Sequence, residues 1–168
     1  MPYSYQFFDQ EVVGVVNHLA PKTVLDVGPG AGKWGHYLRA PGRTIDAIEI
    51  FPKYIDEFNL RLIYNEVFTG DICKFPGLPN YQLIVMGDIL EHLTVEQSKD
   101  LLTRIAEAKA AVLILVPFGY EQGECHGNVH ETHHQPELTE TLFGIRYPGF
   151  TTLFTNHLQG VFFRQGRK

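Results

Sequence analysis

An acidic residue before a run of alternating glycines, with a second acid further along, is a combination that can bind a nucleoside cofactor. Asp26 lies in a short apolar run that ends in Gly28, Gly30 and Gly32. Glycine lets the backbone turn tightly and approach a ligand closely. Glu49 ends the next apolar run, and a carboxylate about 20 residues after such a loop can accept hydrogen bonds from two ribose hydroxyls. This spacing predicts a nucleoside-cofactor site at the carboxyl edge of a parallel sheet.

A second group of reactive side chains follows the apolar run 81–86. His92 is the candidate general base, because an unperturbed imidazole titrates near neutral pH. Asp88 is the second catalytic candidate, and it follows the apolar run where one end of a bound cofactor is expected. The alternative for His92 is a structural role at the start of the next helix. We expect Glu91 to make a structural hydrogen bond.

The segment 118–136 is long, polar and rich in glycine and histidine. Long segments of this kind are typically lids or binding loops. Because it follows an apolar run that reads as a strand, we expect it to cover an acceptor site. A merely solvated loop is the alternative. The candidate substrate-contacting residues are Tyr120, His126, His130, His133 and His134.

The same segment also offers possible metal ligands. They are Cys125, His126, His130 and His134. The Cys-x-x-Cys and His-Glu-x-x-His orders of known zinc sites are missing. The glycines and Pro136 also argue against a helix that would align the histidines. We therefore predict no metal site here, and a metal-binding loop stays as the alternative.

The glycine loop has two other possible interpretations. A phosphate-binding P-loop would need a glycine at Val27 and a hydroxyl residue at Trp34, so it is excluded. Gly30, Gly32 and Gly35 do form a G-x-G-x-x-G pattern, which leaves an NAD(P)-linked oxidoreductase as an alternative. Asp26 disfavours it, because a carboxylate repels pyrophosphate but suits an ammonium group.

The G-x-G-x-G loop preceded by Asp26 resembles the first motif of class I S-adenosylmethionine-dependent methyltransferases. Glu49 matches the ribose-binding acid of that family, and Phe51 matches an aromatic residue that can pack on adenine. Further matches follow in order at 70–72, 81–93 and 111–117. Four motifs in register make the resemblance specific over residues 20–120, and the segment after 120 is only loosely similar.

The resemblance implies S-adenosylmethionine as the cofactor and in-line methyl transfer as the reaction. Such a transfer depends mainly on alignment and exclusion of water, and a base is needed only when the acceptor must lose a proton. A cofactor-binding module without catalysis is an alternative. The residues assigned to the cofactor by the resemblance are Asp26, Gly28, Gly30, Gly32, Glu49, Phe51, Asp71, Ile72, Gly87 and Asp88.

Several motifs that are missing from the sequence narrow the class of methyl acceptor. The Asn/Asp-Pro-Pro-aromatic run of amino-methylating nucleic-acid enzymes is replaced by Gly87-Asp88-Ile89-Leu90, and neither cysteine follows a proline. The net charge of −5 also argues against a nucleic-acid partner. We expect a small-molecule acceptor, such as a metabolite, a sugar or a lipid head group.

The alternation of apolar runs and helical patterns predicts an α/β fold. It is a doubly wound, mostly parallel seven-stranded sheet with helices on both faces, ending in an antiparallel hairpin. Strands are expected at 23–27, 44–50, 66–69, 81–86 and 111–116, and the hairpin strands at 150–154 and 161–164. Helices are expected at 4–20, 32–39, 52–59 and 94–108.

Length and composition fit one domain over residues 1–168, with an N-terminal helix at 4–20 and a core at 22–168. Of the 168 residues, 44% are hydrophobic and 20% charged, which is typical of globular proteins. No apolar run approaches the roughly 20 residues that span a bilayer, so no membrane association is expected. Two cysteines and no signal-peptide pattern favour a cytoplasmic protein. The oligomeric state stays open, with a homodimer as one option.

Overall fold

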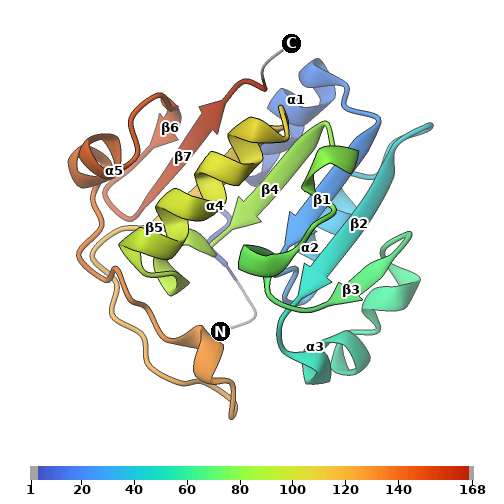
Figure 1. Ribbon diagram of the computed structural model, residues 1–168, viewed down its shortest axis with the longest axis horizontal. Helices are drawn as coiled ribbons and strands as arrows, with labels where there is room; N and C mark the ends of the chain where they lie inside the picture. The colour runs from blue at the N-terminus through green and yellow to red at the C-terminus, as the bar shows by residue number, and fades with distance from the viewer. Residues whose placement is uncertain (1–3, 167–168) are drawn as a thin grey trace.

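The computed structural model describes residues 4–166, so both ends of the predicted domain lie outside the described residues. Its centre is a seven-stranded sheet with the strand order β3-β2-β1-β4-β5-β7-β6 (Figure 1). This is the predicted architecture. The strands are β1 (Thr23–Val27), β2 (Thr44–Glu49), β3 (Val67–Thr69), β4 (Leu83–Gly87), β5 (Ala111–Pro117), β6 (Thr151–Thr155) and β7 (Gln159–Arg164).

The first five strands are parallel, and the last two are not. β1 pairs in parallel with both β2 and β4, so its carboxyl end lies at the middle of the sheet. β7 pairs antiparallel with β5 on one side and with β6 on the other. The short connection between β6 and β7 permits only this antiparallel hairpin. The chain order reverses beside β1, which is where open α/β sheets bind ligands.

Helices cover both faces of the sheet because successive strand residues point to opposite sides. Val24 belongs to one buried cluster and its neighbour Leu25 to the other. The first cluster includes residues of α1 (Asp9–Leu19), α2 (Lys33–Tyr37) and α3 (Pro52–Glu57). The second includes residues of α4 (Val95–Glu107) and α5 (Glu140–Arg146). None of the helices within residues 4–166 is long and apolar enough to cross a membrane.

Local signals explain most of the helix boundaries. Thr94 and Gln97 form the predicted capping box of α4, with both reciprocal hydrogen bonds present. The predicted helix at 4–20 instead begins at Asp9. Lys33 accounts for this difference, because its ammonium group donates to the carbonyl of Tyr5 at 2.8 Å and to the carboxylate of Asp9 at 2.9 Å. These contacts hold the residues before the helix, of which Phe7 and Phe8 form a turn. The sequence patterns did not predict α5, which is only seven residues long.

The segment 118–136 packs against the turn that follows β4. This turn is the short 3-10 helix η4 (Leu90–His92). The Glu91 carbonyl accepts hydrogen bonds from the backbone N–H groups of His134 (2.8 Å) and Gln135 (3.2 Å). The buried Gln135 amide donates to the Leu90 carbonyl at 3.0 Å and to the Leu93 carbonyl at 2.9 Å. The segment is therefore tied to the carboxyl edge of the sheet.

We expect Gln135→Leu to reduce the free energy of unfolding by at least about 2 kcal/mol, because buried partners lose their hydrogen bonds at about 1–3 kcal/mol each. One of these partners is the Tyr147 hydroxyl, which donates to Gln135 at 2.6 Å. Urea unfolding measures the loss. Gln10→Leu makes the same chemical change at an exposed position and is the control. Equal stability of the two variants would contradict this role for Gln135.

Candidate functional site

A pocket of about 540 Å³ opens at the carboxyl edge of the parallel strands. Its walls come from the turns after β1, β2 and β4 and from the segment 118–136, drawn in orange at the same edge in Figure 1. Small-molecule sites typically have volumes of roughly 300–1,000 Å³. The pocket therefore lies where the sequence predicted a site, and it has the size of one.

The glycine loop forms one wall, and its conformation needs glycine. Gly28 and Gly30 line the pocket and have positive φ angles of 61° and 51°. A side chain at Gly28 would also collide with Ile89. Gly32 has a different role from the other two, because it is the N-cap residue of α2 and does not line the pocket. At Gly28 and Gly30 the loop thus presents its backbone to the pocket.

Glu49 lies at the end of β2 and faces the pocket from a buried position, with 3% of its surface exposed. Its Oε1 atom accepts a hydrogen bond from the backbone N–H of Phe51 at 2.8 Å. Burial raises the pKa of Glu49 to about 7, against an ordinary value of 4.5, and the nearby Glu131 adds to this effect. When ionised, this buried carboxylate is suited to accept hydrogen bonds from a ligand that supplies donors.

Two pocket residues, Tyr54 and Glu131, were not among the sequence candidates. The Tyr54 hydroxyl donates to Glu131 at 3.1 Å, which joins α3 to the segment 118–136. Tyr54 lines the pocket, whereas Phe51 packs edge-on against the Tyr54 ring and does not line it. The useful signal for Tyr54 was its position three residues after Phe51, on the first turn of a helix that starts at the pocket.

Asp26 lies behind the glycine loop and not in the pocket wall. Its Oδ2 atom accepts a hydrogen bond from the Tyr64 hydroxyl at 2.5 Å, and the Tyr64 oxygen accepts one from the Gly35 N–H at 3.1 Å. Burial raises the pKa of Asp26 to about 7, and the Tyr64 hydrogen bond opposes this rise. Asp26 and Tyr64 thus support the loop and the start of α2 from below.

Asp88 reaches the pocket from a strained backbone position at the end of β4. Its φ angle is 54°, and its N–H donates to the Leu115 carbonyl at 3.0 Å. The Gln159 side chain donates to its carboxylate at 3.5 Å. Burial raises the pKa of Asp88, and the Lys33 cation opposes this. Asp88 therefore holds a proton more readily than an exposed aspartate, as a general base at near-neutral pH requires.

His92 also lines the pocket, but its environment weakens it as a base. Burial lowers the pKa of His92 to about 4, and the neighbouring His133 contributes to this shift. A neutral imidazole with so low a pKa holds a proton poorly at pH 7. Of the two catalytic candidates, Asp88 has the pKa that suits proton transfer better.

The remaining candidates divide between the pocket and its surroundings. Tyr120 and His126 are exposed outside the pocket, and His133 packs behind it against His92, with ring centroids 4.6 Å apart. Of the predicted site residues, those that line the pocket are Gly28, Gly30, Glu49, Asp71, Ile72, Gly87, Asp88, His92, His130 and His134.

Comparison with solved structures places this geometry in a known fold. The chain aligns with the N-terminal domain of EvdMO1 with S-adenosylhomocysteine bound at a TM-score of 0.72 and 13% identity, covering 98% of this chain and 83% of that one. The methyltransferase domain of bacterial CtHen1 gives a TM-score of 0.69 at 16% identity, with 94% and 96% covered. The chain has the class I methyltransferase fold.

Other proteins of this fold are considerably longer than this chain. Human N-acetylserotonin methyltransferase, solved with S-adenosylmethionine, aligns at a TM-score of 0.68 and 18% identity, covering 96% of this chain and 52% of that one. A candidate O-methyltransferase from Nostoc punctiforme aligns at 0.66 and 16%, with 93% and 55% covered. The chain spans about half the length of these two proteins. No family model and no curated protein matches the sequence.

The support beneath the glycine loop can be tested by the pH dependence of stability. The pKa of Asp26 rises from its ordinary 3.8 to about 7 on folding, so the folded protein holds an extra proton between these values and loses stability as pH rises through this window. Removing the Tyr64 hydroxyl raises that pKa further. We expect Tyr64→Phe to lower the free energy of unfolding by about 1–3 kcal/mol, and by more at pH 8 than at pH 5.

Urea unfolding of wild type and Tyr64→Phe at the two pH values measures this difference. Tyr37→Phe, at a side chain that is 47% exposed, is the control. A penalty that is the same at pH 5 and pH 8 would mean that Tyr64 does not stabilise the ionised form of Asp26.

Proposed function

We propose that this protein is an S-adenosylmethionine-dependent methyltransferase that acts on a small-molecule acceptor. The observation that carries the proposal is the buried carboxylate of Glu49, which faces the pocket beside the glycine loop. Its position at the end of β2 suits two ribose hydroxyls as donors. The fold neighbours solved with S-adenosylmethionine or S-adenosylhomocysteine give further support.

The reaction needs little covalent chemistry from the protein. An electron pair of the acceptor attacks the methyl carbon, and the carbon–sulfur bond breaks with its electrons passing to sulfur, which leaves S-adenosylhomocysteine. When the acceptor is a hydroxyl, its proton must leave, and Asp88 is the group in the pocket whose raised pKa suits that transfer. The walls supply alignment and exclude water.

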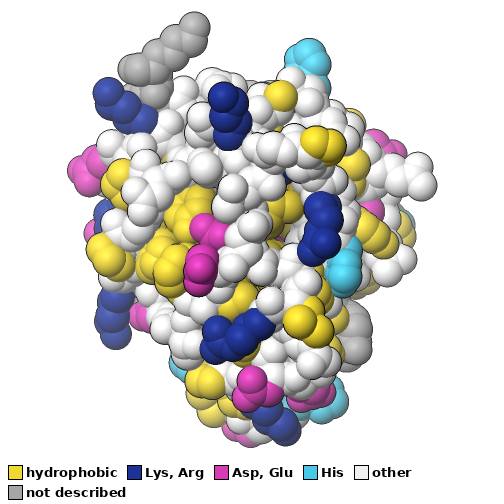
Figure 2. All heavy atoms as spheres, turned by 90° about the vertical axis from the view of Figure 1, so that its right-hand side faces the viewer, with side chains coloured by type: hydrophobic (Ala, Val, Ile, Leu, Met, Phe, Trp, Pro, Cys, Tyr) yellow, Lys and Arg dark blue, Asp and Glu magenta, His cyan; other side chains and the backbone are white. Residues whose placement is uncertain are grey.

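The charge of the pocket supports a small acceptor over a polyanion. Four acids line it, against the single lysine Lys33, and acids repel a phosphate backbone. The acids are Glu49, Asp71, Asp88 and Glu131. The face in Figure 2 carries Lys and Arg side chains singly among acidic and hydrophobic ones, and no continuous basic surface is visible on it. EvdMO1 has also been crystallised in the presence of S-adenosylhomocysteine and D-fucose, which makes sugars natural first acceptors to test.

Glu49 should control cofactor affinity in a pH-dependent way. At pH 8, Glu49→Gln should weaken S-adenosylhomocysteine binding by at least about tenfold, because two hydrogen bonds to a charged acceptor are worth about 1.5–3 kcal/mol each. The pKa of Glu49 is about 7 in the free protein, and the ligand prefers the ionised form. Wild-type affinity should therefore fall by roughly tenfold per pH unit below 7. Calorimetry from pH 5.5 to 8.5 measures both effects, and an unchanged slope in Glu49→Gln would contradict this role.

Binding and turnover together test the proposed function. We expect S-adenosylhomocysteine to bind in calorimetry and NADH not to bind. Labelled methyl groups should pass from S-adenosylmethionine to one or more members of a panel of sugars, phenols and other hydroxylated metabolites. Asp88→Asn should retain S-adenosylhomocysteine binding within about tenfold and lose about 10²–10⁴-fold in turnover. Binding of NADH alone would overturn the proposal in favour of an oxidoreductase, and binding without any turnover would favour a non-catalytic module.

A further inference from the structure

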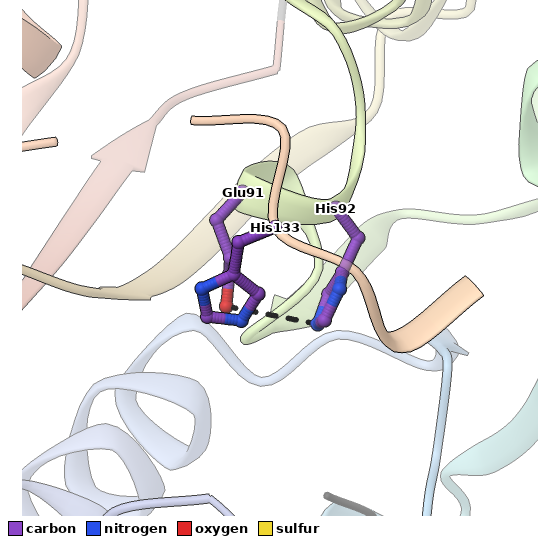
Figure 3. A group of neighbouring side chains, drawn as sticks. All are labelled: Glu91, His92 and His133. Carbon is purple, nitrogen blue, oxygen red and sulfur yellow. Dashed lines mark ion pairs between the residues drawn. The ribbon is translucent and has the colours of Figure 1, made fainter. Parts of the chain in front are cut away.

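Three side chains from two distant segments converge at the wall of the pocket. Glu91 and His92 come from η4, and His133 comes from the segment 118–136. One ligand atom of each lies within 4.8 Å of the other two. Figure 3 shows the three side chains pointing toward one another, with the Glu91–His92 pair marked. His92 also lines the pocket, so the cluster is next to it.

Each imidazole has its Nδ1 atom beside a backbone carbonyl. The Nδ1 atom of His92 lies 3.3 Å from the Thr132 carbonyl, and the Nδ1 atom of His133 lies 2.7 Å from the Tyr120 carbonyl. A carbonyl oxygen can only accept a hydrogen bond, so each Nδ1 carries the proton. Each Nε2 is left with a free lone pair. Histidines that bind metals are oriented in this way, by an N–H donated to a carbonyl or carboxylate.

The third member is a carboxylate without a partner. Glu91 is 1% exposed, and neither of its oxygens has a hydrogen-bond partner among residues 4–166. Its Oε1 atom lies 4.0 Å from Nε2 of His92, which is too long for a hydrogen bond. Burying a polar group without a partner costs several kcal/mol. With Glu91 ionised, the cluster therefore brings together three groups that accept, and no hydrogen bond satisfies the carboxylate.

We propose that Glu91, His92 and His133 bind a divalent first-row transition-metal ion. Two imidazoles and one carboxylate, with further positions open, are the ligands of catalytic zinc and of non-haem iron sites. Each ligand atom needs to move by less than about 1 Å to reach a bond of about 2.0–2.2 Å. Imidazole ligands favour such ions over Mg²⁺ and Ca²⁺, which prefer oxygen.

The charge of the cluster agrees with its geometry. Glu91 is buried and its carboxylate oxygens have no hydrogen-bond partner among residues 4–166. A divalent ion between the three groups would compensate the buried negative charge.

The ion would also define the acceptor chemistry, and this step rests on the proposed function. Open positions on the ion can hold a hydroxyl oxygen of the acceptor and favour loss of its proton. Asp88 would receive that proton, the oxygen would bond to the methyl carbon of S-adenosylmethionine, and the electron pair of the carbon–sulfur bond would pass to sulfur. The acceptor class is therefore an alcohol, a phenol or a diol, with methylation at oxygen.

This site differs from the metal-binding loop that the sequence offers as an alternative. The sequence candidates Cys125, His126, His130 and His134 form no group of three ligands in the described part of the chain. The folded chain instead combines one histidine of that segment with the Glu91-His92 pair. That pairing depends on the backbone bonds between Glu91 and residues 134–135.

Metal titration of chelator-treated protein tests the site directly. We expect Zn²⁺, and with lower affinity Mn²⁺, to bind at one ion per chain in calorimetry, and Co²⁺ to give visible absorption bands that Zn²⁺ abolishes. Mg²⁺ should not compete. His133→Ala and Glu91→Gln should each weaken Zn²⁺ binding by at least about tenfold. His126→Asn is the matched control, because His126 is an exposed histidine of the same segment with φ 54°, which Asn tolerates.

A second measurement distinguishes failure of the metal site from failure of the proposed methyltransferase function. S-adenosylhomocysteine should still bind to the chelator-treated protein and to Glu91→Gln, and it should fail to bind only if the proposed function itself is wrong. Circular dichroism of each variant verifies the fold. Absence of stoichiometric Zn²⁺ binding in wild type would overturn the site and indicate a protonated Glu91 bridged by water. Zn²⁺ binding that His126→Asn weakens as much as His133→Ala does would overturn it as well.

Discussion

The carbonyl oxygen of Glu91 is the point on which the arrangement of the site depends. It accepts two backbone hydrogen bonds from the segment 118–136, and so holds that segment at the end of β4. Gln135 extends the attachment by binding the neighbouring carbonyls. Through this junction the pocket wall formed by the segment 118–136 is fixed relative to the glycine loop. This junction contributes to the positions of Glu131 and His133, which hydrogen bonds with Gln122 also hold.

The same edge of the sheet concentrates buried carboxylates. Asp26, Glu49 and Glu91 are almost fully buried, and burial raises the pKa of each. Each lies at or just beyond the carboxyl end of a parallel strand, where side chains converge. Such groups reduce stability above their pKa, because the folded protein must then bury a charge. Groups with such shifted pKa values cluster at functional sites. Ligands that bring hydrogen-bond donors or positive charge would reduce the cost of the buried charge.

Much of the fold and the glycine-loop wall of the pocket could be predicted from the sequence, because these features are local. Apolar runs predicted the strands, and Thr94 with Gln97 predicted a helix start. The turn glycines and Glu49 follow directly from strand ends. The role of Asp26 could not be read in this way, since its partner Tyr64 is 38 residues away. The low pKa of His92 likewise results from burial by a distant segment, and the short α5 lacked a long periodic pattern.

The predicted and the unpredicted features lie in different parts of the molecule. Elements shared with proteins only 10–18% identical to this chain form the sheet and the glycine-loop edge. Fold alone does not fix function, which depends on the groups that a site contains. Here η4 and the segment 118–136 bring Glu91, His92 and His133 together. The glycine-loop edge of the pocket thus follows from the geometry of strand ends, and the opposite wall follows from how one long segment is attached to a single turn.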